Sequence, residues 1–375
     1  MPLSRPLLAL LLAAGASPGL AAEAGNASPL KITGFASLVL GVNLDGERDQ
    51  PLAYNPDIDC PCTVTNWTYN GIYEGRSVSA APDSKAGVQF NYAPLRDLDF
   101  TVQLISRGSD PKPALEWAFA SYQLSDRVSL SLGRMRLPIY YYSDFHDVGF
   151  AYPWITPPGE VYGWEVNNYN GGSLRFRDTL ADGELTLRVF GGNEKVKDSG
   201  YYETFSVDRI DVRWKHIAGA DLEWQRDWLT VRLGHVMADG ESTDTAAGIT
   251  TPEDIRTTSL AVNGDFGALF FLSEVGFLTR KFTADGYSVD SPSFSIGGGY
   301  RFADNWTAFL NYAWYRDNST DPAFEYFRFS SSSATLRYDI NKKSDVKLQY
   351  SVHDDDSFDY TGNSQLLRVA YDIVF

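Results

Sequence analysis

The sequence predicts an all-β fold: a transmembrane antiparallel β-barrel of about sixteen strands. Short runs alternate between apolar and polar residues along most of the chain, and the connections between them are alternately short and long. After residue 22 no stretch approaches the ~18 consecutive apolar residues of a membrane-spanning helix. In lipid every backbone polar group needs a protein partner, so a membrane-spanning sheet must close on itself. A secreted β-sandwich or β-helix is the alternative, but sandwiches lack this contrast between loops.

The first 22 residues read as a secretory signal peptide. They hold one charge, Arg5, then an apolar run and small residues up to Ala22. This divides the chain into a signal peptide, 1–22, and a single barrel domain, 23–375. Without Arg5 the remaining chain has 31 Lys and Arg against 48 Asp and Glu, a net charge of −17. That charge argues against nucleic acid as a partner.

Composition agrees with an exported outer-membrane barrel. Tyr and Phe number 22 each, Gly 32 and Cys only 2. Sixteen runs of about ten residues have the length of tilted membrane strands. The expected runs are 30–41, 84–93, 98–107, 114–124, 127–137, 172–178, 184–191, 215–225, 228–237, 257–265, 267–279, 291–302, 306–315, 328–340, 345–353 and 365–375.

The connections alternate in length. Seven are tight turns, and the longest of the others are expected at 43–83, 138–168, 192–214, 238–256 and 316–327. Bacterial barrels have short periplasmic turns and long outer loops, and an even number of strands places both ends in the periplasm.

The segment 138–168 differs from the other connections. It holds four prolines, which block regular hydrogen-bonded structure, and nine aromatic residues from Tyr140 to Trp164. A disordered linker would not be so aromatic, and structureless loops of this length are usually functional. We therefore expect an ordered loop packed inside the barrel. Its tyrosines and Trp154 would hold the loop to the wall or, alternatively, stack on solutes.

The final run carries a family resemblance. In 366–375, LLRVAYDIVF, Tyr371 and the terminal Phe375 share one face, which resembles the signal read by the outer-membrane barrel-assembly machinery. With sixteen strands, the chain from residue 23 resembles the Gram-negative general porins. The resemblance implies a passive, water-filled channel for ions and small hydrophilic solutes, an inward-folded constriction loop at 138–168 and a homotrimer.

The resemblance also implies which residues shape the channel. In such porins the constriction loop presents carboxylates to basic residues on the opposite wall. The acidic candidates are Asp144, Asp147, Glu160 and Glu165. The basic candidates are Lys85, Arg107, Arg134, Arg136, Arg175, Arg177, Arg188 and Arg368, with Arg232, Arg337 and Lys347 also on polar faces.

Arg134 and Arg136 fit the alternation poorly. They share parity with Leu130 and Leu132, which should face lipid, where a charge at mid-depth costs roughly 2–4 kcal/mol. We expect a bulge at Gly133 to turn both arginines into the lumen. Without a bulge they would lie at the headgroup boundary and bind anionic lipid.

Cys60 and Cys62 lie in a predicted outer loop beside Asp57 and Asp59. An oxidising compartment favours a disulfide, although a bond across one residue is geometrically tight. A metal site lacks a nearby His, and free or intermolecular thiols are the remaining alternative.

The sequence gives little support for an enzyme and implies no cofactor. Of the four histidines, His146 has Ser143 three residues away, but three residues apart in a loop is no catalytic triad, and there is no Gly-x-Ser-x-Gly motif. The alternatives to a general porin are a substrate-selective outer-membrane channel and, with less support, a barrel enzyme or an adhesin. Acidic outer loops, such as Asp354 to Asp356, would contact lipopolysaccharide through divalent cations.

Overall fold

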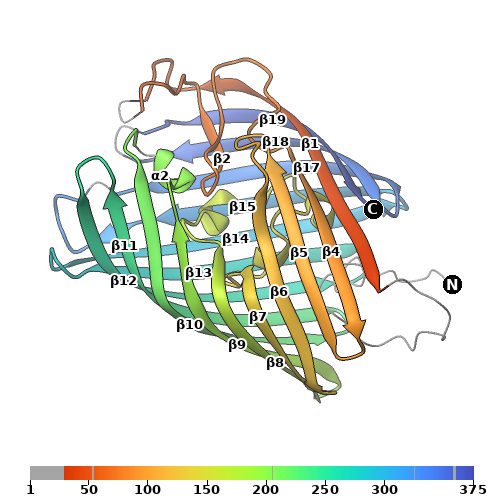
Figure 1. Ribbon diagram of the computed structural model, residues 1–375. Helices are drawn as coiled ribbons and strands as arrows, with labels where there is room; N and C mark the ends of the chain where they lie inside the picture. The colour runs from red at the N-terminus through yellow and green to blue at the C-terminus, as the bar shows by residue number, and fades with distance from the viewer. Residues whose placement is uncertain (1–28, 53–54, 205, 325, 358–359) are drawn as a thin grey trace.

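The computed structural model describes residues 29–52, 55–204, 206–324, 326–357 and 360–375. Within these residues sixteen antiparallel strands form a sheet that closes through pairing of β1 with β19 (Figure 1). In order around the barrel the strands are β1 (Leu30–Gly46), β4 (Lys85–Leu95), β5 (Leu98–Arg107), β6 (Ala114–Ser125), β7 (Val128–Arg136), β8 (Asn168–Leu180), β9 (Gly183–Val196), β10 (Ile210–Arg226), β11 (Leu229–Asp244), β12 (Ile249–Asp265), β13 (Leu269–Phe282), β14 (Tyr287–Ala303), β15 (Trp306–Arg316), β17 (Arg328–Asn341), β18 (Ser344–Asp355) and β19 (Ser364–Val374). The two-residue strand β16 (Asn318–Ser319) pairs with the outer end of β14. The predicted fold class is confirmed.

Successive side chains of each strand point alternately out of and into the barrel. On β18, Leu348 and Tyr350 are exposed on the outside, whereas Lys347, Gln349 and Ser351 are buried inside. The outward residues form the apolar surface that a bilayer requires, and the polar residues line the lumen. The sequence alternates because each strand has the bilayer on one side and the lumen on the other.

Both described ends of the chain lie at the end of the barrel that carries the seven predicted tight turns (Figure 1). The turn between β8 and β9 uses Ala181 and Asp182, both at positive φ, as a two-residue hairpin turn of this hand requires. Phe375 and Gly34 exchange two backbone hydrogen bonds of 2.9 Å, so the last residue takes part in closing the barrel.

One of the predicted long loops is wrong, and a second is shorter than predicted. The segment 238–256 is mostly strand, because β11 and β12 continue to a turn at 245–248, and 192–214 is shortened by the ends of β9 and β10. These strand ends are rich in Thr, Ser, Asp and Glu. A strand that continues beyond the apolar band has polar residues on both faces, so it resembles a loop in composition.

Loops at the other end fold over the lumen. The connection from β1 to β4 carries a small hairpin of β2 (Thr63–Asn66) and β3 (Gly71–Tyr73), and the connection from β9 to β10 carries α2 (Gly200–Glu203). We call the apolar cluster formed here the outer cap; it comprises Leu52, Ile58, Cys60, Cys62, Val64, Trp67, Ile72 and Tyr360. In the described part of the chain, no helix is long and apolar enough to cross a membrane.

Candidate functional site in the barrel lumen

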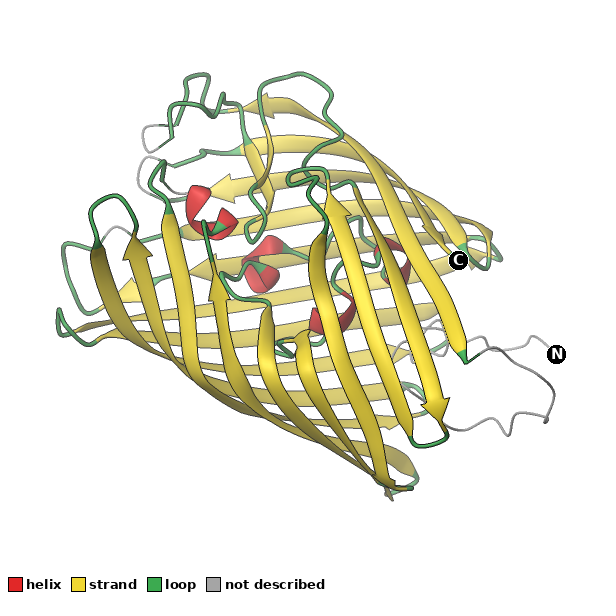
Figure 2. Ribbon diagram, viewed as in Figure 1, coloured by secondary structure: helices red, strands yellow, loops and turns green. Residues whose placement is uncertain are grey.

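The connection between β7 and β8, residues 137–167, folds into the lumen as predicted (Figure 2). It contains the short helices η3 (Ser143–Phe145), η4 (Gly149–Ala151) and α1 (Gly159–Tyr162). Its aromatic side chains are buried: Tyr152 is fully inaccessible, and Trp154 and Trp164 are each 4 % exposed. We call this segment the lumen loop. Most of its aromatic residues hold it in place by packing on one another and on the wall.

The lumen loop reaches opposite walls of the barrel. The backbone N–H of Tyr141 donates to Glu274 on β13 at 2.8 Å, and six residues later Asp147 contacts Arg107 on β5 at 2.8 Å. Strands β5 and β13 lie eight positions apart in the ring of sixteen, so they face each other. Lys347 on β18 donates to the carbonyl of Gly149 at 2.6 Å. The loop therefore crosses the lumen.

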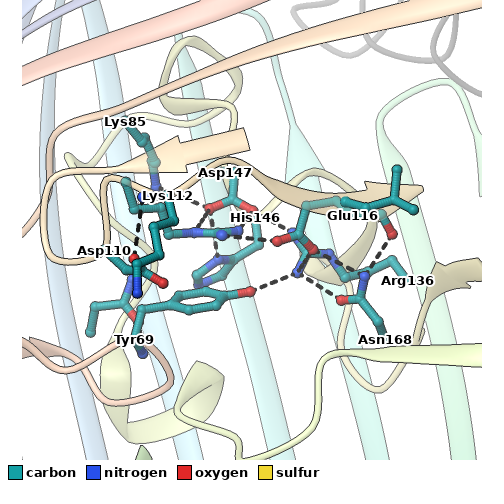
Figure 3. Close-up of polar contacts among 12 residues, drawn as sticks. Tyr69, Lys85, Asp110, Lys112, Glu116, Arg136, His146, Asp147 and Asn168 are labelled. Carbon is teal, nitrogen blue, oxygen red and sulfur yellow. Dashed lines mark hydrogen bonds and ion pairs between the residues drawn. The ribbon is translucent and has the colours of Figure 1, made fainter. Parts of the chain in front are cut away.

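A compact group of charges anchors the middle of the loop (Figure 3). We call Lys85, Arg107, Glu116, Arg136 and Asp147 the Asp147 cluster. The Asp147 carboxylate is bound by the guanidinium groups of Arg107 and Arg136, and the ammonium of Lys85 lies 3.8 Å away. Glu116 contacts the same two arginines at 2.8 and 3.3 Å. Three cations thus surround two carboxylates in a buried site.

The electrostatics of this site follow from burial and charge. Burial opposes ionisation of Asp147, but Arg107, Arg136 and Lys85 outweigh it and hold the pKa of that carboxyl well below its usual range. Burial also lowers the pKa of the neighbouring His146 to about 3; Asp147 opposes this shift, and the three cations add to it. At neutral pH His146 is therefore uncharged and Asp147 is ionised.

The other acidic candidates lie along the loop. Asp144 contacts Arg188 at 3.1 Å, and Arg188 also contacts Asp221 at 2.7 Å. Glu165 accepts from the indole nitrogen of Trp214 at 2.7 Å and lies 3.4 Å from Arg280. Asp144, Asp147 and Glu165 therefore touch wall cations directly. These contacts are direct because the loop crosses the lumen and brings its carboxylates to the wall.

Glu160 differs from the other three carboxylates. It lies on α1, facing β17, where Ser331 is its hydrogen-bonding neighbour. Burial raises the pKa of its carboxyl, an effect that Ser331 and the more distant Arg368 oppose.

The basic candidates separate into three groups. Lys85, Arg107 and Arg136 bind Asp147, and Arg188 binds Asp144. Arg368 contacts Asp83 at 2.8 Å and the hydroxyl of Thr156 at 2.9 Å. Arg175 and Arg177 lie on β8, with Arg175 opposite Arg188 in the register. Of the further basic residues, Arg232 donates to the carbonyl of Pro138, and Arg337 donates to those of Phe150 and Tyr152.

Arg134 and Arg136 have different surroundings. Arg136 reaches the Asp147 cluster, whereas Arg134 contacts Glu194 at 2.6 Å and the carbonyl of Leu115. The predicted bulge at Gly133 is wrong, because β7 pairs continuously with β6 and β8 on either side of it. Gly133 instead has a φ of +137°, which other residues rarely adopt.

Sequence reasoning missed several lumen acids, chiefly Glu116 and Glu274. A register shift in the pairing of β5 with β6 displaces Glu116 from simple alternation, so its inward position had no signal. For Glu274 there was a weak indication in the sequence, because this carboxylate lies on the polar side of an alternating run.

The two cysteines lie at the outer end of the barrel. Cys60 and Cys62 are joined by a disulfide within the outer cap. Across the described residues, no group of three or more His, Cys, Asp or Glu side chains could hold a metal ion. Asp355 accepts hydrogen bonds from Ser357 and Thr361 of its own loop. Tyr371 and Phe375 are both exposed on the outer face of the barrel.

Comparison with known proteins shows which solved structures share this fold. No family model and no curated protein matches the chain. Among solved structures, OmpT, an outer membrane protein of Vibrio cholerae, matches with a TM-score of 0.61 at 9 % identity over 93 % of this chain and 99 % of that one. The fold is that of the sixteen-stranded porins. The anion-selective porin of Comamonas acidovorans matches at 13 % identity, with 92 % of this chain and 99 % of that one covered, and OmpF of Salmonella typhi at 15 %, covering 92 % and 97 %, both with a TM-score of 0.60.

Proposed function

We propose that this protein is an outer-membrane channel that lets water, ions and small hydrophilic solutes diffuse down their gradients. The observation that carries the proposal is a closed barrel with a polar lumen, into which one long loop is folded and anchored by the Asp147 cluster. An apolar exterior and a polar interior are what a bilayer-embedded pore requires. The fold shared with porins supports the same reading.

The lumen loop would set the size and charge preference of the channel. Its crossing from β13 to β5 leaves less free cross-section than a loop held along one wall. This favours the finer reading of a narrow, substrate-selective channel over a wide general pore. Arg175 and Arg177, which form no ion pair with a loop carboxylate within the described part of the chain, would then be the basic wall groups that meet a passing solute.

Export and assembly belong to the same proposal. The segment 1–22 lies outside the described residues, and we propose that it is a signal peptide for export to the outer membrane of a Gram-negative bacterium. Tyr371 on β19 and Phe375 directly after it, both exposed, would be recognised by the barrel-assembly machinery. The likeness to the trimer form of Vibrio cholerae OmpT supports a homotrimer, and outer-loop acids would meet lipopolysaccharide.

Planar-bilayer recording of the purified protein tests the proposal. Stepwise conductance increments with a defined reversal potential in a salt gradient are expected. Insertion of folded, heat-modifiable protein without any conductance would contradict a channel. Labelling with a serine-hydrolase probe tests the enzyme alternative and should give no signal, because the His146 ring is buried beside Tyr162.

A further inference from the structure

A crevice between the lumen loop and β15–β19 has room only for water. Thr156 and Glu160 of the loop line it on one side, and strand residues such as Ser331 line it on the other. Its free volume, counted as the space open to the centre of a water molecule, is about 50 Å³. One water needs about 10–15 Å³ of such space, so the crevice takes a few waters. The path along this wall is therefore closed to larger solutes.

The hairpin of β2 and β3 forms one side of this crevice. It descends from the outer end of the barrel towards the lumen loop (Figure 1). Residues 63–65 and Trp67 of the hairpin line the crevice together with Glu160 of the loop. The ring of Trp67 also lies 4.8 Å, between centroids, from the ring of Phe329 on β17. The hairpin thus bridges the loop and the wall, and its withdrawal would widen the crevice.

The base of the hairpin is fixed to the barrel. The side-chain amide of Asn43 on β1 donates to the carbonyls of Pro61 and Tyr73 at 2.7 and 2.9 Å. The side-chain oxygen of Asn43 accepts from the hydroxyl of Thr63 at 2.7 Å. The hydroxyl of Tyr73 donates to Asp83 at 3.0 Å. These contacts lie where the two short strands begin and end, so they hold the hairpin at its base in the way that a hinge holds a lid.

The tip of the hairpin lies on the lumen loop. A Cβ atom at Gly159 would come within 2.6 Å of the indole ring of Trp67, and one at Gly163 within 2.8 Å of the Trp67 Cβ. The two glycines therefore leave the room that the ring occupies. The backbone N–H of Trp164 donates to the hydroxyl of Thr68 at 3.1 Å. These contacts do not belong to the hydrogen-bonded ladder of the barrel, so the tip can leave while the barrel stays closed on itself.

One side chain connects the tip to the Asp147 cluster. The guanidinium carbon of Arg107 lies 3.7 Å from the centre of the Tyr69 ring, and the hydroxyl of Tyr69 accepts from Arg136 at 3.2 Å (Figure 3). Both arginines also bind Asp147 of the lumen loop. The same two cations thus contact the loop and the hairpin tip, so docking of the tip depends on the loop being in place.

We propose that the hairpin of β2 and β3 is a gate, which pivots at Asn43 and opens the path along β15–β19 when its tip leaves the lumen loop. The structure holds it in the docked, closed position. The inference rests on the proposed channel and adds to it a closed and an open state of the same chain.

The variant Gly159→Ala tests the gate, because the added methyl group takes the space of the Trp67 ring. Alanine favours helix, so α1 and the lumen loop should keep their fold while the tip is displaced. Overpacking by one methyl group should raise the ratio of released to docked tip about tenfold. The matched control is Gly298→Ala on the exposed face of β14, where the new methyl group would meet no atom within 4 Å.

Single-channel recording measures the opening. The parent should be closed for most of the time and open briefly. Gly159→Ala should raise the ratio of open to closed time about tenfold, whereas Gly298→Ala should match the parent. Trp67→Ala removes the ring that the methyl group would strike. Gly159→Ala should therefore have no further effect when it is added to Trp67→Ala.

Thiol labelling follows the tip without requiring conduction. Thr68→Cys is introduced together with Cys60→Ser and Cys62→Ser, so that the chain carries one thiol. The Thr68 side chain is buried, and the thiol should react slowly with maleimide while the tip is docked. Adding Gly159→Ala should speed the reaction about tenfold. Heat-modifiable mobility shows that each variant has formed its barrel.

The outcomes separate the gate from the proposed channel. Faster labelling with an unchanged ratio of open to closed time overturns the gate and leaves the channel intact. If Gly159→Ala changes neither quantity, the hairpin is a fixed part of the wall and the gate is refuted. Equal effects of Gly159→Ala and Gly298→Ala refute the contact with Trp67 as the latch. Faster labelling of a folded protein that never conducts contradicts the channel itself, although the tip moves.

Discussion

The variant Asp147→Asn tests whether the Asp147 cluster holds the lumen loop in place. The carboxylate is 2 % exposed and compensates two arginines and one lysine. An asparagine keeps the size and removes the charge, leaving three buried cations with only Glu116 among them. Removing one partner of a buried ion pair costs about 3–5 kcal/mol. That cost corresponds to a shift of between about two and four orders of magnitude in the equilibrium between docked and released loop.

The assay is single-channel recording at about 0.1 M salt, because the Debye length of ~10 Å at this ionic strength exceeds the contact distances in the cluster and screens its charges only weakly. A released loop should give larger and noisier conductance steps, and the loss of one negative charge should shift the reversal potential towards anions. At about 1 M salt, where the Debye length falls to ~3 Å, the shift in selectivity should weaken, whereas the change in step size should persist.

Asp144→Asn is the matched control, because the same chemical change is made on the same loop. Its side chain is 40 % exposed, and its partner Arg188 keeps Asp221. An exposed pair is worth about 0–1 kcal/mol, so this variant should conduct like the parent. Adding Arg136→Met to Asp147→Asn should cost less than the sum of the two single changes, because it removes a stranded cation. If Asp147→Asn conducts and selects as Asp144→Asn does, the Asp147 cluster does not anchor the loop.

Three further predictions concern acid, assembly and the outer cap. Burial lowers the pKa of His146 from 6.5, so docking of the loop should be fully stable above pH 6.5 and should lose about 2 kcal/mol by pH 5. Conductance should change with pH over the same range, and His146→Gln should remove most of this change. Deleting Phe375 removes its paired hydrogen bonds with Gly34 and should lower the amount of heat-modifiable protein in the outer membrane, and unchanged levels would count against a role in assembly. Cys60 and Cys62 should react with maleimide only after reduction, and changing both to serine should leave conductance nearly unchanged, because the barrel ladder does not depend on them.

Alternation of residues was sufficient to predict the barrel because each strand separates lipid from lumen. The length, prolines and aromatic residues of 138–168 likewise predicted an ordered loop inside it. Neither the alternation nor the composition of the loop predicts which charged side chains contact each other. Asp147 binds Arg107, 40 positions earlier, and Lys85 lies 62 positions earlier on a neighbouring strand. Such contacts depend on how the loop crosses the lumen, and no local pattern in the sequence encodes that path.

The aromatic residues and the charged contacts of the lumen loop have different roles in holding it in the barrel. Aromatic packing on the β9–β13 side is non-directional, so it favours burial without fixing the position of the loop along the wall. Charged contacts are directional, and they occur at three separate places: Arg107 and Arg136 at Asp147, Lys347 at Gly149, and Arg337 at Phe150 and Tyr152. Together they hold the loop to β5 and β7 at Asp147 and to β17 and β18 at the other two places. The position of the loop in the lumen is therefore set by contacts with both walls, and loosening the Asp147 cluster should change the conductance of the channel.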